Sequence, residues 1–385
     1  MPEAVIVDAV RTPLGKRNGA LSDWHPADLA AETLKALAER NNLDPVIVDD
    51  VIMGCVSQVG DQTWNIGRNA VLGAGWPESV PGVTIDRQCG SSQQSVHFAA
   101  QGVIAGAYDV VIAAGVESMT RVPMGSSATG GKPFGERMRS RYHHQLIPQG
   151  LSAEMISERW NISREELDGY ALDSQARALR AAEEGRFDNE IIPIEIKHEG
   201  SATTLTRDEG IRPSTTPEGL ASLKPAFKED GVVTAGNSSQ ITDGATAILI
   251  MSRAKADELG LKPRARFVSF SVVGTDPISM LTGPIVATEK VLAKGGMTID
   301  DIDLFEVNEA FAAVVGAWLR ETGADWAKVN VNGGAIALGH PLGASGARLM
   351  TTLLNELERS GGRFGLQTMC EGGGLANGTI IEILR

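Results

Sequence analysis

Residues 80–94, V-P-G-V-T-I-D-R-Q-C-G-S-S-Q-Q, decide the fold class of this chain. The run from Val80 to Ile85 predicts a strand. A helix is expected from Ser91 to about Gly106, with Ser91 or Ser92 as its cap, and a second strand from Asp109 to Ala114. Apolar strands that alternate with helices predict an α/β fold whose parallel sheet is covered on both faces.

The same alternation continues away from this stretch. Further strands are expected at 4–10, 50–54, 241–251, 303–307, 328–331 and 364–369, and helices at 26–40, 163–184 and 340–359. Both ends of the chain therefore carry strand, sharp turn, helix and strand, which indicates a duplication. Between about Met119 and Thr234 the sequence is polar and rich in loops, so we expect an inserted surface lobe there.

Composition narrows the class of protein. A chain of 385 residues predicts two or three lobes, and a net charge of −13 argues against binding to nucleic acid or to an acidic membrane surface. Three cysteines, at 55, 89 and 370, form neither a disulfide framework nor a metal-binding pair. No signal peptide and no apolar run long enough to span a bilayer is found. We expect a cytoplasmic protein that binds no membrane.

Cys89 is the first candidate for chemistry. Its thiol is expected just before a helix N-terminus, where backbone N–H groups and the helix dipole favour a thiolate. The alternative is a buried structural thiol, the commoner fate of a free cysteine. Small polar neighbours, Gly90 and Ser91, favour the reactive interpretation, whereas Cys55 in I-M-G-C-V lacks them and is expected in the core.

A thiol nucleophile needs a base, and His340 is the best candidate. It lies in G-G-A-I-A-L-G-H-P-L-G, residues 333–343, with Pro341 at the expected first position of a helix. A histidine in such a turn can face a cleft and exchange protons near neutral pH. The alternative is a tight turn that leaves His340 on the surface. The other five histidines show no such setting.

Two further candidates follow predicted strands. Cys370 in C-E-G-G-G ends the strand at 364–369, where open α/β sheets place their sites, although a core thiol is the alternative. Asn308 follows the strand at 303–307 and could orient a water or a base, or simply form a turn. Glu371 is expected to be an exposed charge without a role. No G-x-G-x-x-G after a strand, no G-x-x-x-x-G-K-[ST] and no H-E-x-x-H occurs, so nicotinamide, ATP and zinc chemistry lack support.

Seven short motifs, in order, resemble the thiolase family over essentially the whole chain. They are D-A-V-R-T-P at 8–13, Q-C-G-S-S at 88–92, G-V-E-S-M at 115–119, T-A-G-N at 234–237, N-E-A-F at 308–311, the glycine-rich run at 333–343 and C-E-G-G-G at 370–374. The resemblance implies two similar βαβαβαββ halves in five α/β/α/β/α layers. The expected divisions are 1–118 with 240–262 for the first half, 119–239 for the loop domain and 263–385 for the second half.

The resemblance also implies roles. Cys89 would carry the acyl group as a thioester, His340 would activate its thiol, and Cys370 would act as acid and base. One oxyanion hole would combine His340 with a water held by Asn308, and the other the backbone N–H groups of Cys89 and Gly372. Coenzyme A (CoA) would be a substrate in contact with Ser239 and Arg212, with no metal and no permanently bound cofactor. Family members are homodimers or homotetramers that act on acyl-CoA.

The substrate loop separates the subtypes. Pro148, Gln149 and Gly150 stand where short-chain biosynthetic thiolases carry H-M-G, and the segment is similar to the L-I-P-M-G of degradative 3-ketoacyl-CoA thiolases. We therefore expect CoA-dependent cleavage of 3-ketoacyl-CoA, in fatty-acid or sterol side-chain breakdown. The alternatives are acetoacetyl-CoA formation by an acetyl-CoA acetyltransferase and a non-catalytic lipid-binding relative, which would lose reactive residues. Ketoacyl synthases carry histidine or asparagine in place of Cys370.

Overall fold

In the computed structural model, which describes residues 2–198 and 201–384, one mixed sheet runs through the molecule. The strand order is β10-β11-β12-β9-β1-β8-β5-β3-β4, and β2 pairs with β8. The strands are β1 (Ala4–Arg11), β2 (Gly15–Lys16), β3 (Asp50–Gly54), β4 (Val83–Ile85), β5 (Val110–Ser118), β8 (Thr242–Ser252), β9 (Ala265–Gly274), β10 (Leu304–Val307), β11 (Phe364–Glu371) and β12 (Leu375–Ile383). A separate hairpin is formed by β6 (Ile194–His198) and β7 (Ser201–Leu205).

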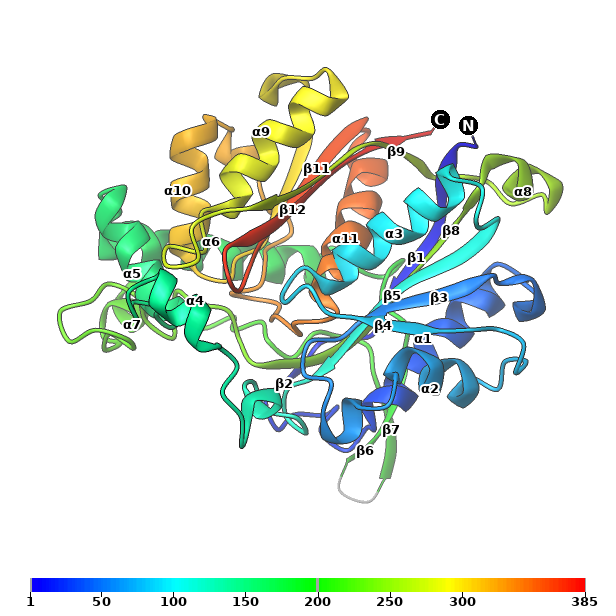
Figure 1. The fold of residues 1–385 in the computed structure, drawn as a ribbon, viewed down its shortest axis with the longest axis horizontal. Coiled ribbons are helices and arrows are strands. Elements are labelled where there is room, and N and C mark those ends of the chain that lie inside the picture. Colours follow the sequence, from blue (N-terminus) through cyan, green and yellow to red (C-terminus); the bar gives the residue numbers. More distant parts are fainter. Residues whose placement is uncertain (1, 199–200, 385) are drawn as a thin grey trace.

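Helices cover this sheet in layers, as Figure 1 shows. They are α1 (Pro26–Arg40), α2 (Ile66–Gly73), α3 (Ser91–Ile104), α4 (Glu136–Arg141), α5 (Gln149–Arg159), α6 (Arg164–Glu183), α7 (Pro217–Ala221), α8 (Arg253–Glu258), α9 (Gly283–Gly295), α10 (Ala312–Thr322) and α11 (Ser345–Ser360). Helices α1 and α2 pack outside the β1–β8–β5–β3 half, and α9 and α10 pack outside the β9–β12–β11–β10 half. Helices α3 and α11 lie between the two halves.

These five layers are the α/β/α/β/α arrangement that the sequence predicts. The boundaries proposed for the two halves and the loop domain stay predictions, because β1 and β9 join the strands of both halves into one sheet. Within the described ranges, no helix is long and apolar enough to cross a bilayer.

Strand directions correct the expectation of a parallel sheet. β3 runs parallel to β4 and β5, and β10 to β11, but β8 is antiparallel to both of its long neighbours, β1 and β5. Strand β12 is also antiparallel to β9 and β11.

Two element boundaries and one strand were predicted wrongly. Strand β4 begins at Val83 instead of Val80, and α11 begins at Ser345 instead of His340. Residues 328–331 form no strand: Val329 makes a single bridge to Phe305, and Asn330 turns the chain with a φ of 46°.

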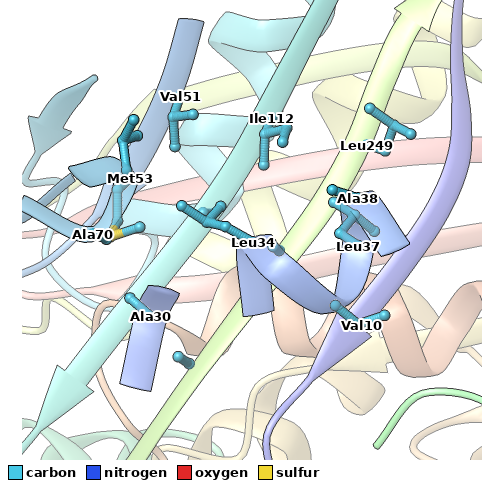
Figure 2. Packing of buried hydrophobic residues seen from close by; sticks show 14 of the residues in the cluster. Val10, Ala30, Leu34, Leu37, Ala38, Val51, Met53, Ala70, Ile112 and Leu249 are labelled. Carbon is cyan, nitrogen blue, oxygen red and sulfur yellow. The ribbon is translucent and has the colours of Figure 1, made fainter. Parts of the chain in front are cut away.

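The packing of α1 shows how the sequence pattern builds the outer layer. Its small and branched apolar residues recur on one face, and Ala30, Leu34 and Leu37 are all buried. Figure 2 shows them against side chains from the neighbouring strands, including Ile112 of β5 and Leu249 of β8. Burying one such leucine contributes about 1.5–3 kcal/mol, so this face fixes α1 on the sheet.

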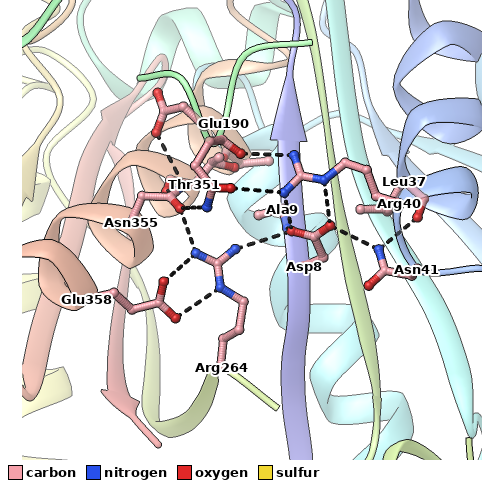
Figure 3. Close-up of polar contacts among 12 residues, drawn as sticks. Asp8, Ala9, Leu37, Arg40, Asn41, Glu190, Arg264, Thr351, Asn355 and Glu358 are labelled. Atoms are coloured by element: carbon pink, nitrogen blue, oxygen red, sulfur yellow. Dashed lines mark hydrogen bonds and ion pairs between the residues drawn. The ribbon is translucent and has the colours of Figure 1, made fainter. Parts of the chain in front are cut away.

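A polar junction ties the two halves together where β1 leaves β9 (Figure 3). The carboxylate of Asp8 accepts hydrogen bonds from Arg40 (3.1 Å) and Asn41 (2.9 Å) at the end of α1. It also accepts from Arg264 (3.2 Å), which in turn donates to Asn355 of α11 (2.6 Å). One carboxylate on β1 thus links the outer helix, the start of β9 and the middle layer.

Candidate active site

Cys89 lies in a tight turn between β4 and α3. Gln88 adopts a positive φ of 48°, and its N–H donates to Asp86 Oδ1 (2.6 Å). Gly90 is the N-cap residue and no side chain caps it, so the expectation that Ser91 or Ser92 caps the helix is wrong. Instead Ser91 Oγ donates to Gln88 O (2.6 Å) and stabilises the turn. The turn presents a thiol that is only 6% exposed.

Glycines allow this turn to lie against the strand ends. A Cβ atom at Gly90 would come within 1.8 Å of Glu371 Oε1, and one at Gly54 within 2.4 Å of the backbone nitrogen of Ser92. No side chain fits at either position. The end of β3, the start of α3 and the end of β11 therefore meet at backbone distance around Cys89.

The electrostatics of Cys89 differ from the sequence expectation. Burial, and then the nearby Glu371, raise the pKa of its thiol to about 12. The backbone N–H groups of Cys89 and Gly372 act in the opposite direction and lower this pKa. The expectation of a thiolate favoured by the helix N-terminus is wrong for the free protein, because desolvation outweighs the two N–H groups. The thiol is neutral at rest and needs a base.

The backbone around His340 holds it inside the protein. Gly339 has a φ of 107°, and a Cβ there would lie 2.3 Å from Thr242 Oγ1. The His340 N–H donates to the same hydroxyl (3.0 Å). Pro341 is part of this turn and not the first residue of α11, contrary to expectation. His340 is 3% exposed, which contradicts the surface alternative.

Hydrogen bonds select one tautomer of His340. Ser345 Oγ donates to Pro341 O (2.8 Å), so it accepts from His340 Nδ1–H (2.5 Å). The lone pair therefore lies on Nε2, which faces the amide nitrogen of Asn308 at 3.4 Å. Burial, and then Arg348, lower the pKa of His340 to about 3. The ring is a neutral acceptor, the form that a general base requires.

Asn308 lies where the sequence predicts, directly after β10. Its N–H donates to Thr368 O of β11 (3.1 Å), which continues the parallel pairing of the two strands. The side-chain oxygen Oδ1 is buried and has no hydrogen-bond partner among the described residues. A buried amide oxygen normally has a partner, so this atom is suited to hold a water.

Cys370 lies near the end of β11, and its side chain is 1% exposed. Burial raises the pKa of its thiol well above the usual value, and the charge of Cys89 is the second cause. The two sulfurs are therefore close enough to influence each other's ionisation.

The loops that carry Cys89 and His340 also interlock. Ala347 N at the start of α11 donates to Ser92 Oγ of α3 (2.9 Å), and a Cβ at Gly346 would meet the Gln93 nitrogen at 2.3 Å. The first turns of α3 and α11 therefore touch. Segments that are far apart in the sequence meet here, and the roles predicted for Cys89 and His340 stay predictions.

Glu117, at the end of β5, is a residue whose role the sequence reasoning missed. Its carboxylate is fully buried and accepts four hydrogen bonds, at 2.8–3.1 Å, from Val56 N, Ser57 N, Gln62 Nε2 and Gly343 N. The signal was a lone acid in the otherwise apolar run V-V-I-A-A-G-V-E-S. Glu117 ties the Cys55 loop to the loop that carries His340.

Glu117→Ala should destabilise the fold strongly. Each buried donor left without a partner costs about 1–3 kcal/mol, and this change leaves buried N–H donors on two loops without an acceptor. We expect the free energy of unfolding, measured by urea denaturation, to fall by several kilocalories per mole. The exposed Glu229→Ala is the control and should change it by less than about 0.5 kcal/mol. Equal stability of the two variants would contradict an anchoring role.

A cavity of about 860 Å³ opens onto Cys89 and Gly372. Most of its wall is apolar, and residues 119–239 contribute Met124, Phe134 and Leu146 to the lining. Pro148 and Gln149 of the predicted substrate loop line it as well. Such dimensions suit an elongated apolar group. His340, Cys370 and Asn308 lie outside this lining.

The two predicted CoA contacts lie elsewhere. Arg212 lines a separate cavity of about 140 Å³ and donates to Gln240 Oε1 (3.1 Å). Ser239 is half-buried, and its N–H donates to Ala310 O (3.0 Å), next to Asn308 in the chain. The contact of each with CoA stays a prediction.

Comparisons with known proteins agree with this arrangement. The family model of the thiolase N-terminal domain matches residues 4–254, and that of the thiolase C-terminal domain matches residues 261–383. A steroid 3-ketoacyl-CoA thiolase of Mycobacterium tuberculosis is 53% identical over 100% of the chain and 95% of its own length. A 3-ketoacyl-CoA thiolase of Aliivibrio fischeri is 46% identical over 99% and 100%. The crystal structure of Bacillus anthracis acetyl-CoA acetyltransferase has a TM-score of 0.92 at 42% identity, covering 100% of the chain and 99% of that protein.

Proposed function

Because the chain belongs to the thiolase family of acyltransferases, we propose that it is a 3-ketoacyl-CoA thiolase of fatty-acid or sterol side-chain degradation. It cleaves 3-ketoacyl-CoA with CoA to give acetyl-CoA and a shortened acyl-CoA. The full-length relatives named 3-ketoacyl-CoA thiolase support this reaction, and CoA enters it as a substrate. The chemistry requires proton transfer and oxyanion donors, which the chain's own residues supply without a resident cofactor.

In the first half-reaction the Cys89 thiol gives its proton to His340 Nε2, and the sulfur attacks the C3 carbonyl of the substrate. The bond between C2 and C3 then breaks. The electron pair passes to C2, which takes a proton from the Cys370 thiol, and acetyl-CoA leaves. Cys89 now carries the shortened acyl group as a thioester, His340 is protonated and Cys370 is a thiolate.

The second half-reaction restores the resting state. The Cys370 thiolate takes the proton of the CoA thiol, and the CoA sulfur attacks the thioester carbonyl. The Cys89 sulfur leaves and recovers its proton from His340. Two separate thiols are needed because one sulfur is bound to the acyl group while the other moves protons.

Two sets of donors would stabilise the oxyanions. The N–H groups of Cys89 and Gly372 would serve the oxygen of the acyl group on the nucleophile, as the family resemblance implies, and their lowering of the Cys89 pKa supports their nearness to that residue. His340 and a water on Asn308 Oδ1 serve the thioester oxygen of the acetyl unit, a role that the 3.4 Å contact between their side chains supports. Removing one such donor typically lowers the rate by about 10²–10³-fold.

The observation that carries the proposal is a cavity of about 860 Å³ that ends at Cys89 and Gly372. The test is to incubate the protein with CoA and a series of 3-ketoacyl-CoA substrates of increasing chain length and to measure acetyl-CoA by mass spectrometry. We expect acetyl-CoA release, with higher kcat/KM for chains longer than four carbons, because the apolar wall gains contacts with each added methylene. No acetyl-CoA release from any chain would refute the function.

A second candidate is acetoacetyl-CoA formation, the reaction of an acetyl-CoA acetyltransferase. The close structural match to the Bacillus anthracis acetyltransferase favours it. The same chain-length series separates the two, because a strong preference for the four-carbon substrate would identify the acetyltransferase.

We further propose a homo-oligomer in the cytoplasm. The support for self-association is an open sheet edge at β4, close to Cys89, where Val83 is 39% exposed and Phe98 of α3 is 42% exposed. Sedimentation velocity at micromolar concentration tests this, and a monomer would contradict it. Cell fractionation tests the location.

A further inference from the structure

Glu371 is a buried acid for which the proposed mechanism has no use. The sequence favoured an exposed charge here, but the residue is 0% exposed, because its side chain lies against Gly90 at the start of α3. Neither carboxyl oxygen has a hydrogen-bond partner among the described residues. Oε1 lies against Gly90, 1.8 Å from where a Cβ would stand, directly behind the nucleophile turn. A buried acid in this state needs a physical explanation.

An acceptor faces Gly90 together with Glu371. Asn377 Oδ1 of β12 lies 2.9 Å from the same Cβ position and has no hydrogen-bond partner within the described ranges. The orientation of its amide is fixed from α3: Asn377 Nδ2 donates to Gln94 Oε1 (3.2 Å) and to His97 Nδ1 (3.1 Å). An amide oxygen accepts only, so it is a favourable neighbour for a protonated carboxyl and an unfavourable one for a carboxylate.

The charges around Glu371 also affect whether its carboxyl group is protonated. Burial raises the pKa of Glu371 well above its usual value, Arg87 lowers it, and Asp86 raises it. Arg87 forms no ion pair with Glu371, although its Nε is buried and has no partner among the described residues. The titratable and charged groups that act on Glu371 come from the nucleophile turn and from β11. They are Asp86, Arg87, Cys89 and Cys370. From α3 and β12, His97 and Asn377 contact each other beside this site.

We propose that Glu371 is held as a neutral carboxylic acid behind Cys89, and that its ionisation in alkaline solution suppresses ionisation of the nucleophile. In the neutral state the acid places no charge beside the sulfur, so His340 can take the thiol proton. Once Glu371 loses its own proton, the carboxylate repels a Cys89 thiolate, because both groups are buried and solvent screens their charges weakly. Glu371 is thus a positioning residue that sets the alkaline limit of acylation. The inference rests on Cys89 as the nucleophile of the proposed function.

The test compares wild type with Glu371→Gln, which keeps the shape and neutrality of the acid but cannot ionise. The rate of alkylation of Cys89 by iodoacetamide, followed by peptide mass spectrometry, reports the thiolate population without any substrate. Near neutral pH the two proteins should react at similar rates. At about pH 10 the variant should react about tenfold faster or more, because one unit of pKa is a tenfold change in thiolate.

Glu382→Gln is the matched control, since it removes a buried carboxylate from the opposite end of the same strand pair. Its alkylation profile should follow wild type, and thermal unfolding should show that both variants fold. An equal rate ratio for Glu371→Gln at every pH, or a slower variant in alkaline solution, would overturn the proposal.

Infrared spectroscopy gives a second readout. The wild type minus Glu371→Gln difference spectrum at neutral pH should contain the carbonyl band of a protonated carboxylic acid. A carboxylate band in its place would overturn the proposal as well. Neither measurement requires turnover, so a failure here is distinct from a failure of the proposed function, which is judged by acetyl-CoA release alone.

Discussion

Cys89→Ala should abolish cleavage of 3-ketoacyl-CoA. The mechanism has no other acceptor for the acyl group, because Cys370 serves in it only as the proton-transfer group. Removing an enzyme nucleophile lowers turnover by several orders of magnitude, and we expect a loss of about 10⁴-fold or more in kcat. The measurement is acetyl-CoA release in the presence of CoA, together with mass spectrometry of the intact protein after exposure to acyl-CoA. The acyl adduct seen on wild type should be missing.

Cys55→Ala is the control for this experiment. It also removes a buried thiol, but one that is packed in the outer core with Val51 and Met53. Turnover and adduct formation should persist, with at most a modest loss of stability of about 1 kcal/mol. An adduct that still forms in Cys89→Ala would move the nucleophile to another residue and refute the assignment.

Cys370→Ala should separate proton transfer to C2 from acyl transfer to Cys89. Protonation of C2 requires an acid, and a positioned proton-transfer group contributes about 10²–10⁴-fold. We expect acetyl-CoA release from 3-ketoacyl-CoA to fall by that factor. Acylation of Cys89 by a saturated acyl-CoA needs no proton on carbon. The CoA sulfur that leaves is a thiolate that can take its proton from solvent when Cys370 is missing, so the adduct should form more slowly but still appear in the mass spectrum.

His340→Ala is the variant with which the cleavage and adduct formation of Cys370→Ala are compared. The imidazole takes the Cys89 proton in every route to the thioester, so its removal should suppress both cleavage and adduct formation. If Cys370→Ala lost the adduct to the same extent as His340→Ala, the division of labour between acyl carrier and proton shuttle would be wrong.

Much of the fold could be predicted because its local patterns agree with its packing. The helix at 26–40 was found from its apolar spacing, and β1 and β8 from continuous apolar runs. The directions of those strands could not be found in this way, since an apolar run looks the same whether its neighbour is parallel or antiparallel. The strand predicted at 328–331 is wrong for a similar reason, because the local pattern there is typical of a strand. The side-chain amide of Asn330 instead hydrogen-bonds to the backbone of Val307 (2.8 Å), and the chain turns at this residue.

The site was predictable to the extent that its residues sit in distinctive turns. Cys89 and His340 each stand next to a glycine, and Cys370 is followed by Gly372 two residues later. Gly90 and Gly339 mark places where a side chain would clash with the neighbouring segment. Burial was the part that the sequence concealed. Glu371 looks like an exposed charge in a glycine-rich segment, and only the meeting of β11 with α3 shows that it is enclosed. The same burial overrides the helix N-terminus and keeps the Cys89 thiol neutral.

The shared middle layer has a consequence for how the protein is made. Helix α11 covers the inner face of β1 and β8 through Met350, Leu353 and Leu354, yet it is made after both strands, since β8 ends at Ser252 and α11 begins at Ser345. Translation adds about 5–20 residues per second, so about 5 to 20 seconds pass between these two points while α11 cannot yet cover that apolar face. During this interval the nascent chain is a natural client for chaperones that shield hydrophobic surface. The loop that carries His340 directly precedes α11, so enzymatic competence also follows this interval.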